Sequence, residues 1–300
     1  MVPGVLDALT LRPAVAGQRA TAIPAEVARW DADAKRLEIG APGARTVWRL
    51  WGDGAPLLLL HGGSGSWRHW IRNLGALLPG RLILAPDIPG LGESDLPEPV
   101  SLDAVVARVV AGLEQILGNG EACQVMGFSF GALVSGGVAS RLQERISTVV
   151  LVGASGLGLP RGDVTLHRVR DRVGPARIDA HRANLASLML ADPANIDALA
   201  LAIQAWNSDH ARLRSVGLSP SDVLLPSLRA STARLRAIWG ARDAVALPTL
   251  PQRIALLRSL QPGADIRTIE GAGHWVAYEA AEAFNAMANE MLGAPITALG

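Results

Sequence analysis

The sequence is poor in cysteine and in long apolar runs, and each scarcity excludes a class of protein. Cys123 is the only cysteine of 300 residues, which excludes an internal disulfide framework and a zinc cluster held by cysteines. No stretch approaches the roughly 18 consecutive apolar residues of a membrane-spanning helix. We therefore expect no metal site, no disulfide, no membrane span and a cytoplasmic location.

The net charge is also close to zero. The 28 basic and 27 acidic side chains leave a formal net charge of +1, so neither a phosphate-binding surface nor an acidic tail is indicated. A nucleic-acid partner is therefore not expected. The first 30 residues contain no continuous apolar segment followed by a cleavage site, which argues against a secretory signal. We predict an N-terminal extension and first strand region over residues 1–45.

Apolar residues, in contrast, make up 49% of the chain, which is enough for one large α/β domain. Seven short apolar runs bounded by turn residues are typical of strands buried on both faces. These runs lie at 46–51, 56–62, 81–87, 123–129, 147–155, 235–240 and 265–271. Stretches of helical period separate most of them, and Ser101 is a suitable N-cap for the one at 101–117. The alternation predicts parallel strands joined by crossover helices.

One interval departs from this alternation. Residues 159–234 contain helix-like segments and no convincing strand, and a strand pattern returns with "LRAIWG" at 235–240. We predict that 159–234 is a helical cap over the strand ends, inserted into a core domain of residues 46–158 and 235–300. A separate helical domain is the alternative.

The stretch "VMGFSFGALVSGG" at 125–137 places Ser129 at the end of a strand pattern and the start of a helix pattern. Gly127 and Gly131 lack the Cβ atoms that would clash where strand and helix approach each other. Such a turn lifts a serine above the sheet and aims the helix N-terminus, with its amides and positive dipole end, at the hydroxyl. The stretch predicts a nucleophilic serine for acyl chemistry.

A serine hydroxyl needs a base within hydrogen-bond reach, and the base needs a carboxylate to orient it. "WGARDAV" places Asp243 just beyond one late strand, and "EGAGHW" places His274 just beyond the last. The order Ser, Asp, His is that of a hydrolase with a nucleophile elbow, so we predict Ser129, Asp243 and His274 as the catalytic residues. The histidines that follow no late strand are weaker candidates for the base: His61, which we expect to brace its loop, His69, His167, His181 and His210.

The glycine-rich stretch "HGGSGSW" at 61–67 directly follows the apolar run "LLLL". Acyl chemistry needs a second donor for the oxyanion, opposite the elbow, and a glycine-rich loop lets backbone N–H groups face the substrate carbonyl. We predict the amides of Phe130 and Gly63 as these donors, with Ser64 as the alternative to Gly63. A phosphate-binding loop is excluded because no Lys-Ser/Thr pair follows the glycines.

Five stretches together resemble the α/β-hydrolase superfamily, from about Thr46 to the C-terminus. They are "HGGSGSW", "PDIPGLGESD", "GFSFG", "WGARD" and "GAGHW". The resemblance implies an α/β-hydrolase fold with a mostly parallel eight-stranded sheet flanked by helices and a helical cap after the sixth strand. It matches Ser129, Asp243 and His274 to the triad and implies that Asp87 is structural. Members with an aspartate nucleophile, the epoxide hydrolases and haloalkane dehalogenases, are disfavoured.

Within this superfamily the chain looks most similar to the serine esterases and to the hydrolases of meta-cleavage products, which cut esters or the C–C bond of a vinylogous diketone. Trp275, directly after the base, is a feature of the C–C hydrolases. Phe128 stands where those enzymes usually have Asn, and "HGGSGSW" lacks their Gly-Pro-Gly. We therefore favour hydrolysis of a carboxylic ester, lactone or thioester, with C–C hydrolysis as the alternative.

The substrate pocket has weaker signals. Arg182 of the predicted cap is a candidate partner for a substrate carboxylate, and Trp67, Phe128, Trp206 and Trp275 are candidate pocket residues. For Trp206, packing within the cap is the alternative. We expect a small-molecule substrate and no cofactor. A homodimer, an acyltransferase or perhydrolase activity, and a non-catalytic ligand receptor on the same fold stay open.

Overall fold

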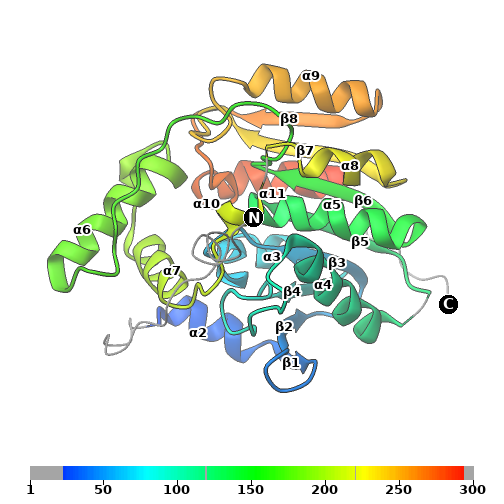
Figure 1. Ribbon diagram of the computed structural model, residues 1–300, viewed down its shortest axis with the longest axis horizontal. Helices are drawn as coiled ribbons and strands as arrows, with labels where there is room; N and C mark the ends of the chain where they lie inside the picture. The colour runs from blue at the N-terminus through cyan, green and yellow to red at the C-terminus, as the bar shows by residue number, and fades with distance from the viewer. Residues whose placement is uncertain (1–22, 119, 220, 294–300) are drawn as a thin grey trace, which may run out of the picture.

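The computed structural model describes residues 23–118, 120–219 and 221–293, and an eight-stranded sheet lies at its centre (Figure 1). The strands are β1 Lys35–Ile39, β2 Thr46–Trp51, β3 Ala55–Leu60, β4 Arg81–Pro86, β5 Cys123–Phe128, β6 Ile146–Val152, β7 Arg234–Gly240 and β8 Asp265–Ile269. Their spatial order is β1-β2-β4-β3-β5-β6-β7-β8. The pairs β1–β2 and β2–β4 are antiparallel and the others are parallel. The predicted mostly parallel eight-stranded sheet is confirmed.

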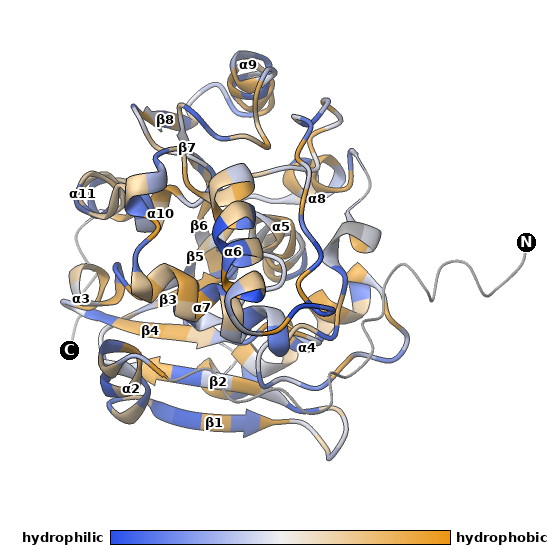
Figure 2. Ribbon diagram, turned by 90° about the vertical axis from the view of Figure 1, so that its left-hand side faces the viewer, coloured by the Kyte–Doolittle hydropathy of each residue, from blue (hydrophilic) through white to orange (hydrophobic). Residues whose placement is uncertain are grey.

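β1 is the strand that the apolar runs did not reveal. Its sequence KRLEI pairs with β2 at the edge of the sheet, with Leu37 opposite Trp48. Polar side chains suit an edge strand, because one side of it has no neighbouring strand. Figure 2 shows the contrast between the largely hydrophilic β1 and the largely hydrophobic β4 in the interior. Residues 1–22 of the predicted N-terminal extension lie outside the described residues.

Helices cover both faces of the sheet. Because successive residues of a strand point to opposite sides, an inner strand contributes side chains to an apolar cluster on each face. One apolar cluster contains Leu58 and Leu60 of β3, and the other contains Leu57 and Leu59. The first cluster includes side chains of α4 Leu102–Leu117, α5 Phe130–Leu142 and α9 Leu250–Leu260. The second includes side chains of α2 Ala25–Ala32, α3 Leu74–Leu77, α10 Val276–Glu279 and α11 Ala281–Leu292. This two-sided burial explains why the inner strands are continuous apolar runs.

The chain leaves the sheet after β6 and returns at β7, and the segment between them is helical. It contains α6 Gly174–Asn184, η3 Leu185–Met189, η4 Pro193–Asn195, α7 Ala198–Asp209, η5 Ser215–Leu218 and α8 Leu224–Ala230. In Figure 1, α6 and α7 stand beside the edge at which the parallel strands end. Leu224 of α8 instead belongs to the same apolar cluster as Val134 and Val138 of α5. The predicted segment 159–234 therefore includes one helix that packs on the sheet layer.

Candidate active site

Ser129 lies in a sharp turn between β5 and α5. Its backbone has φ 52° and ψ −109°, a strained conformation for a residue with a side chain, and its N–H donates to the Val152 carbonyl at 2.8 Å. A Cβ atom on Gly127 would lie 2.3 Å from the Gly131 carbonyl oxygen, and one on Gly131 would lie 2.2 Å from the Leu60 carbonyl oxygen. Both positions require glycine because strand and helix backbones touch there.

The three predicted catalytic residues follow β5, β7 and β8, and the structure brings their side chains together. The Ser129 Oγ lies 3.0 Å from the His274 Nε2, and the His274 Nδ1 lies 2.9 Å from each Asp243 carboxylate oxygen. With a neutral imidazole, Nδ1–H donates to Asp243 and Nε2 accepts the Ser129 hydroxyl proton. Asp243 and His274 are buried whereas Ser129 is half-buried. Ser129 therefore keeps some exposed surface while its two partners are sheltered from water.

Backbone groups hold the carboxylate of Asp243. Its Oδ1 accepts the N–H of Val245 at 2.8 Å and that of Ala246 at 3.1 Å. The buried Arg253 ties this loop to the start of the insertion, because it donates to the carbonyls of Ala246 and Pro160. Burial lowers the pKa of the Arg253 guanidinium, and the negative charge of Asp243 nearby opposes that lowering.

The loop between β3 and η1 Trp67–Trp70 carries the predicted oxyanion donor Gly63. A Cβ atom on Gly63 would lie 3.6 Å from the Phe130 Cβ and 2.2 Å from the Ser215 Oγ, so Gly63 lies between the start of α5 and the insertion. Ser64, the alternative donor, has a φ of 50°. Within the described part of the chain, the N–H groups of Gly63 and Phe130 donate to no other backbone group. Both amides are thus available to a substrate oxygen.

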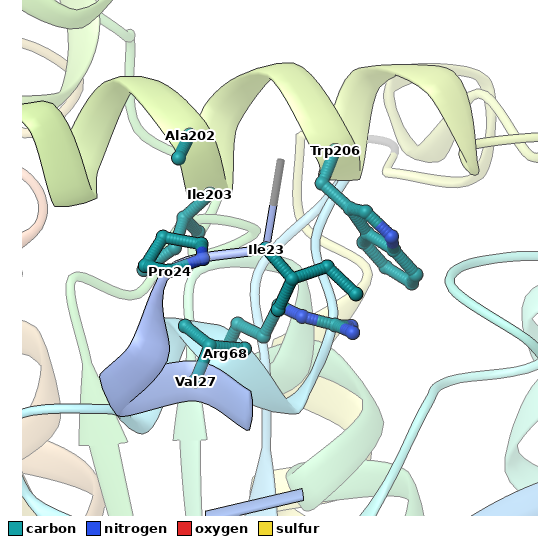
Figure 3. Close-up of a pocket in the computed structure, with 7 residues that line it drawn as sticks. All are labelled: Ile23, Pro24, Val27, Arg68, Ala202, Ile203 and Trp206. Carbon is teal, nitrogen blue, oxygen red and sulfur yellow. The ribbon is translucent and has the colours of Figure 1, made fainter. Parts of the chain in front are cut away.

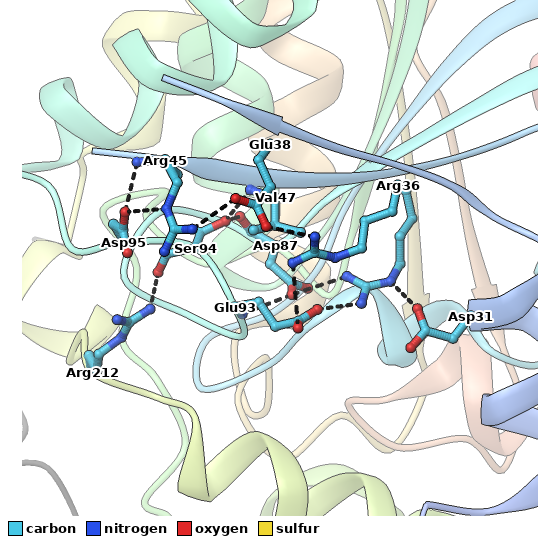
Figure 4. Close-up of polar contacts among 11 residues, drawn as sticks. Asp31, Arg36, Glu38, Arg45, Val47, Asp87, Glu93, Ser94, Asp95 and Arg212 are labelled. Carbon is cyan, nitrogen blue, oxygen red and sulfur yellow. Dashed lines mark hydrogen bonds and ion pairs between the residues drawn. The ribbon is translucent and has the colours of Figure 1, made fainter. Parts of the chain in front are cut away.

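Asp87 lies in an ion-pair cluster around Arg49, and Figure 4 labels the acidic members Asp31, Asp87 and Glu93. The Asp87 Oδ2 is 3.6 Å from the Arg49 Nη1 and accepts the Glu93 N–H at 3.0 Å, while Oδ1 accepts the Trp67 N–H at 3.0 Å. Arg49 also pairs with Asp31 and Glu93. Both oxygens of Asp87 are therefore engaged in holding the end of the glycine-rich loop and the loop after β4.

Two of the predicted pocket residues adjoin the triad segments. The Phe128 ring lies 5.1 Å from the His274 ring and is 1% exposed. Trp275 is fully buried, and its ring stacks on that of Tyr278 at 4.2 Å. A side chain with no exposed surface is more suited to packing behind the site than to contact with a substrate. This favours a structural role for Trp275.

Of the other three predicted pocket residues, one is fully buried and two have partners away from the triad. Trp67 is fully buried. Trp206 stacks over the guanidinium of Arg68 at 3.5 Å, and the two line a cavity of about 10 Å³ (Figure 3). A cavity of that volume holds roughly one water molecule, so it is too small for a substrate. The Arg182 Nη1 donates to the Ile196 carbonyl at 3.3 Å, and its predicted role toward a carboxylate stays a prediction.

Three contacts with the site segments were missed by the sequence analysis. The Glu279 carboxylate accepts the Gly273 N–H, and the Asn207 Oδ1 accepts the Ser66 hydroxyl at 2.6 Å. Ser215 is the third, through its contact with the glycine-rich loop. Asn207 and Ser215 carry no motif. Glu279 had a signal, since it is the one charged residue within five positions after His274.

Within the described ranges, no helix is long and apolar enough to cross a membrane. Over those same ranges, His, Cys, Asp and Glu side chains form no group of three or more that could hold a metal ion.

Known proteins match most of the chain at the level of family. A model of the alpha/beta hydrolase family matches residues 57–287. The 2-hydroxymuconate semialdehyde hydrolase of Pseudomonas sp. strain CF600 is 33% identical over 128 residues, which are 41% of this chain and 44% of that protein. The chain thus aligns with less than half the length of this curated relative.

Two solved structures extend the similarity to most of the fold. The esterase RhEst1 from Rhodococcus sp. ECU1013 aligns with a TM-score of 0.70 at 23% identity, over 86% of this chain and 98% of that chain. A mutant of the meta-cleavage product hydrolase CumD from Pseudomonas fluorescens IP01 aligns with a TM-score of 0.65 at 26% identity, over 85% of this chain and 97% of that chain.

Proposed function

The chain belongs to the α/β-hydrolase family, and we propose that it is a serine hydrolase that cleaves a small carboxylic ester, lactone or thioester. The observation that carries the proposal is the position of His274. Its Nε2 lies 3.0 Å from the Ser129 Oγ, and its Nδ1 lies 2.9 Å from the Asp243 carboxylate. A general base needs this geometry toward both its nucleophile and its orienting acid.

In the proposed reaction the Ser129 Oγ attacks the substrate carbonyl carbon while its proton passes to the His274 Nε2. Asp243 stabilises the imidazolium that forms, because its carboxylate faces Nδ1–H. Collapse of the tetrahedral intermediate expels the alcohol or thiol with the proton from Nε2 and leaves an acyl-enzyme on Ser129. Water activated by the same nitrogen then attacks the acyl carbon, which releases the acid and returns a proton to Ser129.

The negative charge of the tetrahedral oxygen requires donors that are already oriented. We assign the N–H groups of Phe130 and Gly63 to this role, with Ser64 as the alternative to Gly63. The Phe130 N–H is the first amide of α5, so the positive end of the helix dipole adds to the stabilisation. Neither N–H donates to another backbone group among the described residues, which supports the assignment.

The insertion is proposed to act as a cap that selects the substrate. Two contacts support this role, one to each side of the site. The Ser66 hydroxyl of the glycine-rich loop donates to Asn207 of α7, and the Trp275 N–H donates to the Met189 carbonyl at 2.7 Å. Because the insertion is tied to both loops, its side chains are in a position to shape the space above Ser129.

Cleavage of a C–C bond in a meta-cleavage product is the second candidate. It is favoured by the similarity to 2-hydroxymuconate semialdehyde hydrolase and to CumD. Phe128 beside the nucleophile argues against it, because a phenyl ring offers no hydrogen bond to a polar dienoate.

Turnover of short aryl esters, lactones, thioesters and a 2-hydroxy-6-oxo-hexadienoate by the wild type and Ser129→Ala tests the proposal. Ester, lactone or thioester turnover that the variant loses would support it, whereas faster cleavage of the dienoate would favour the C–C hydrolase. A folded protein with no turnover and no labelling of Ser129 by a fluorophosphonate would indicate a non-catalytic receptor and overturn the proposal.

A further inference from the structure

His69 is a buried histidine that the proposed reaction does not use. It lies in η1, is 2% exposed, and accepts the Gly62 N–H at its Nδ1 with a distance of 3.1 Å. Gly62 directly precedes Gly63, whose N–H we assign to the oxyanion. A buried imidazole bonded to the neighbouring peptide can therefore influence the direction of that donor.

A second imidazole holds the other side of Gly62. The His61 Nδ1–H donates to the Gly62 carbonyl at 2.8 Å, and the His61 Nε2 accepts the Ile88 N–H at 2.8 Å. In a trans peptide the C=O and the following N–H point in opposite directions, so the bond to the Gly62 carbonyl aims the Gly63 N–H. Together the two histidines restrain both peptides around a glycine whose dihedrals would otherwise rotate freely.

The imidazole of His69 also touches the other two segments of the site. Its ring lies 5.5 Å from the ring of Phe128, which precedes Ser129, and 5.0 Å from that of Trp275, which follows His274. The Trp275 Nε1–H donates to the His69 carbonyl at 2.9 Å. His69 thus joins the glycine-rich loop, the nucleophile turn and the base loop.

The protonation state of His69 suits a ring nitrogen that accepts a hydrogen bond. Burial, together with the nearby His61 and His274, holds the pKa of His69 well below its usual range. A neutral ring keeps the lone pair of Nδ1 for the Gly62 N–H and carries its proton on Nε2.

We propose that His69 is a positioning residue, whose Nδ1 fixes the His61–Gly62 peptide and, together with the His61 bond to the Gly62 carbonyl, holds the Gly63 N–H in line with the oxyanion on Ser129. The inference rests on the proposed serine-hydrolase function. It assigns His69 a role through its hydrogen bond, beyond the packing of its ring.

Two substitutions separate the hydrogen bond from the packing. His69→Phe keeps a ring against Phe128 and Trp275 but removes the acceptor. His69→Asn loses the ring but can place its Oδ1 where Nδ1 lies and accept the Gly62 N–H. The readouts are kcat and KM for a short aryl ester, and the inhibition constant of a trifluoromethyl ketone, whose adduct on serine carries an oxyanion.

Loss of a whole oxyanion donor lowers kcat by about 100- to 1,000-fold, and a misdirected donor should cost less. We expect His69→Phe to lower kcat by about 10- to 100-fold with little change in KM, and to weaken the trifluoromethyl ketone by a similar factor. His69→Asn should stay within about fivefold of the wild-type kcat, since its acceptor is retained. His167→Phe, the same change at an exposed imidazole on the insertion, should leave all three constants unchanged.

Wild-type kcat in a folded His69→Phe enzyme, or equal losses in the Phe and Asn variants, would overturn the inference. If the Phe variant does not fold, His69→Met carries the same expectation, because methionine fills irregular space and is a poor acceptor. Absence of turnover and of fluorophosphonate labelling in the wild type would instead overturn the serine-hydrolase function. The two failures are therefore distinguishable.

Discussion

The Glu279 carboxylate accepts the N–H of Gly273 at 2.6 Å, one residue before His274. The same carboxylate accepts the N–H groups of Ala191 and Asp192 at 2.9 and 2.8 Å. One side chain of α10 therefore ties the loop of the proposed base to the insertion. A displacement of either segment would strain the contact with the other.

We expect Glu279→Ala to lower the free energy of unfolding by about 2 to 3 kcal/mol, because several N–H groups lose a charged acceptor. Turnover of a short aryl ester should also fall, since the loop that holds His274 loosens. Urea unfolding and kcat measure the two effects, and Glu279→Gln, which keeps one acceptor oxygen, should show smaller ones. Glu290→Ala removes a carboxylate that pairs with Arg267 at the surface and should change stability by less than about 1 kcal/mol. Equal stability of the Glu279 and Glu290 variants would contradict the expectation.

Ser129→Ala should abolish turnover while the fold is retained, since it deletes the nucleophile and little side-chain volume. Loss of a triad member lowers kcat by about 10⁴- to 10⁶-fold. Steady-state kinetics with an activated aryl ester and circular dichroism of the variant make the test. Activity within tenfold of the wild type would refute the assignment of Ser129.

Asp243→Asn should lower kcat by about 10⁴-fold, because an amide favours the wrong tautomer of the imidazole and cannot stabilise its charged form. The loop itself should survive, since the amide oxygen can still accept the N–H groups of Val245 and Ala246. Kinetics of the purified variant, with its melting temperature as the control for folding, give the answer. A variant with wild-type kcat would move the acid's role to another residue.

We expect His181 to make the stability of the protein dependent on pH. It is 2% exposed, and neither ring nitrogen has a hydrogen-bond partner among the residues that the structure describes. Burial lowers its pKa to about 4, and the charge of Arg177 adds to this effect while that of Asp209 opposes it. The unfolded imidazole titrates near 6.5, so the unfolded state binds the proton first as the pH falls. Stability should therefore be lost between about pH 6.5 and pH 4, by roughly 2 kcal/mol at pH 5.

Urea unfolding at pH 7.5 and pH 5 checks this expectation in the wild type and in His181→Leu, which removes the titrating group. The variant should lose less stability between the two pH values. His167→Leu, at an exposed position, should behave like the wild type. A His181→Leu protein that keeps the full pH dependence would show that another group is responsible.

Replacement of residues 163–219 by a short Gly/Ser linker tests the cap. The Gly158 N–H donates to the Ser221 carbonyl, so the segments that flank the deletion lie side by side, and α8 stays on the sheet. Small activated esters, which need the triad and the oxyanion amides, should still be hydrolysed. Larger substrates should lose much more kcat/KM, because contacts with the cap help to position the scissile carbonyl. Equal losses on both substrate classes in a folded variant would show that the insertion does not select the substrate.

The inner strands could be predicted because both faces of each are buried, which turns their sequence into an apolar run. The same signal missed β1, whose edge position allows the polar sequence KRLEI. The helix α8, inside the predicted segment 159–234, shows a second limit of local sequence. Its helical period is the same whether it packs on the sheet or above it, so its partner α5 could not be inferred from local sequence.

The candidate site likewise has residues that the sequence predicts and contacts that it does not. The sequence by itself predicted that Ser129, Asp243 and His274 form one group, because each carries a local signal and parallel topology sends the ends of their strands to one edge. Tertiary structure alone decided the contacts that hold them. Asn207 meets Ser66 across 141 positions and Trp275 meets His69 across 206. Periodicity and turn chemistry are properties of neighbours in the chain, whereas such contacts depend on how distant segments pack against each other.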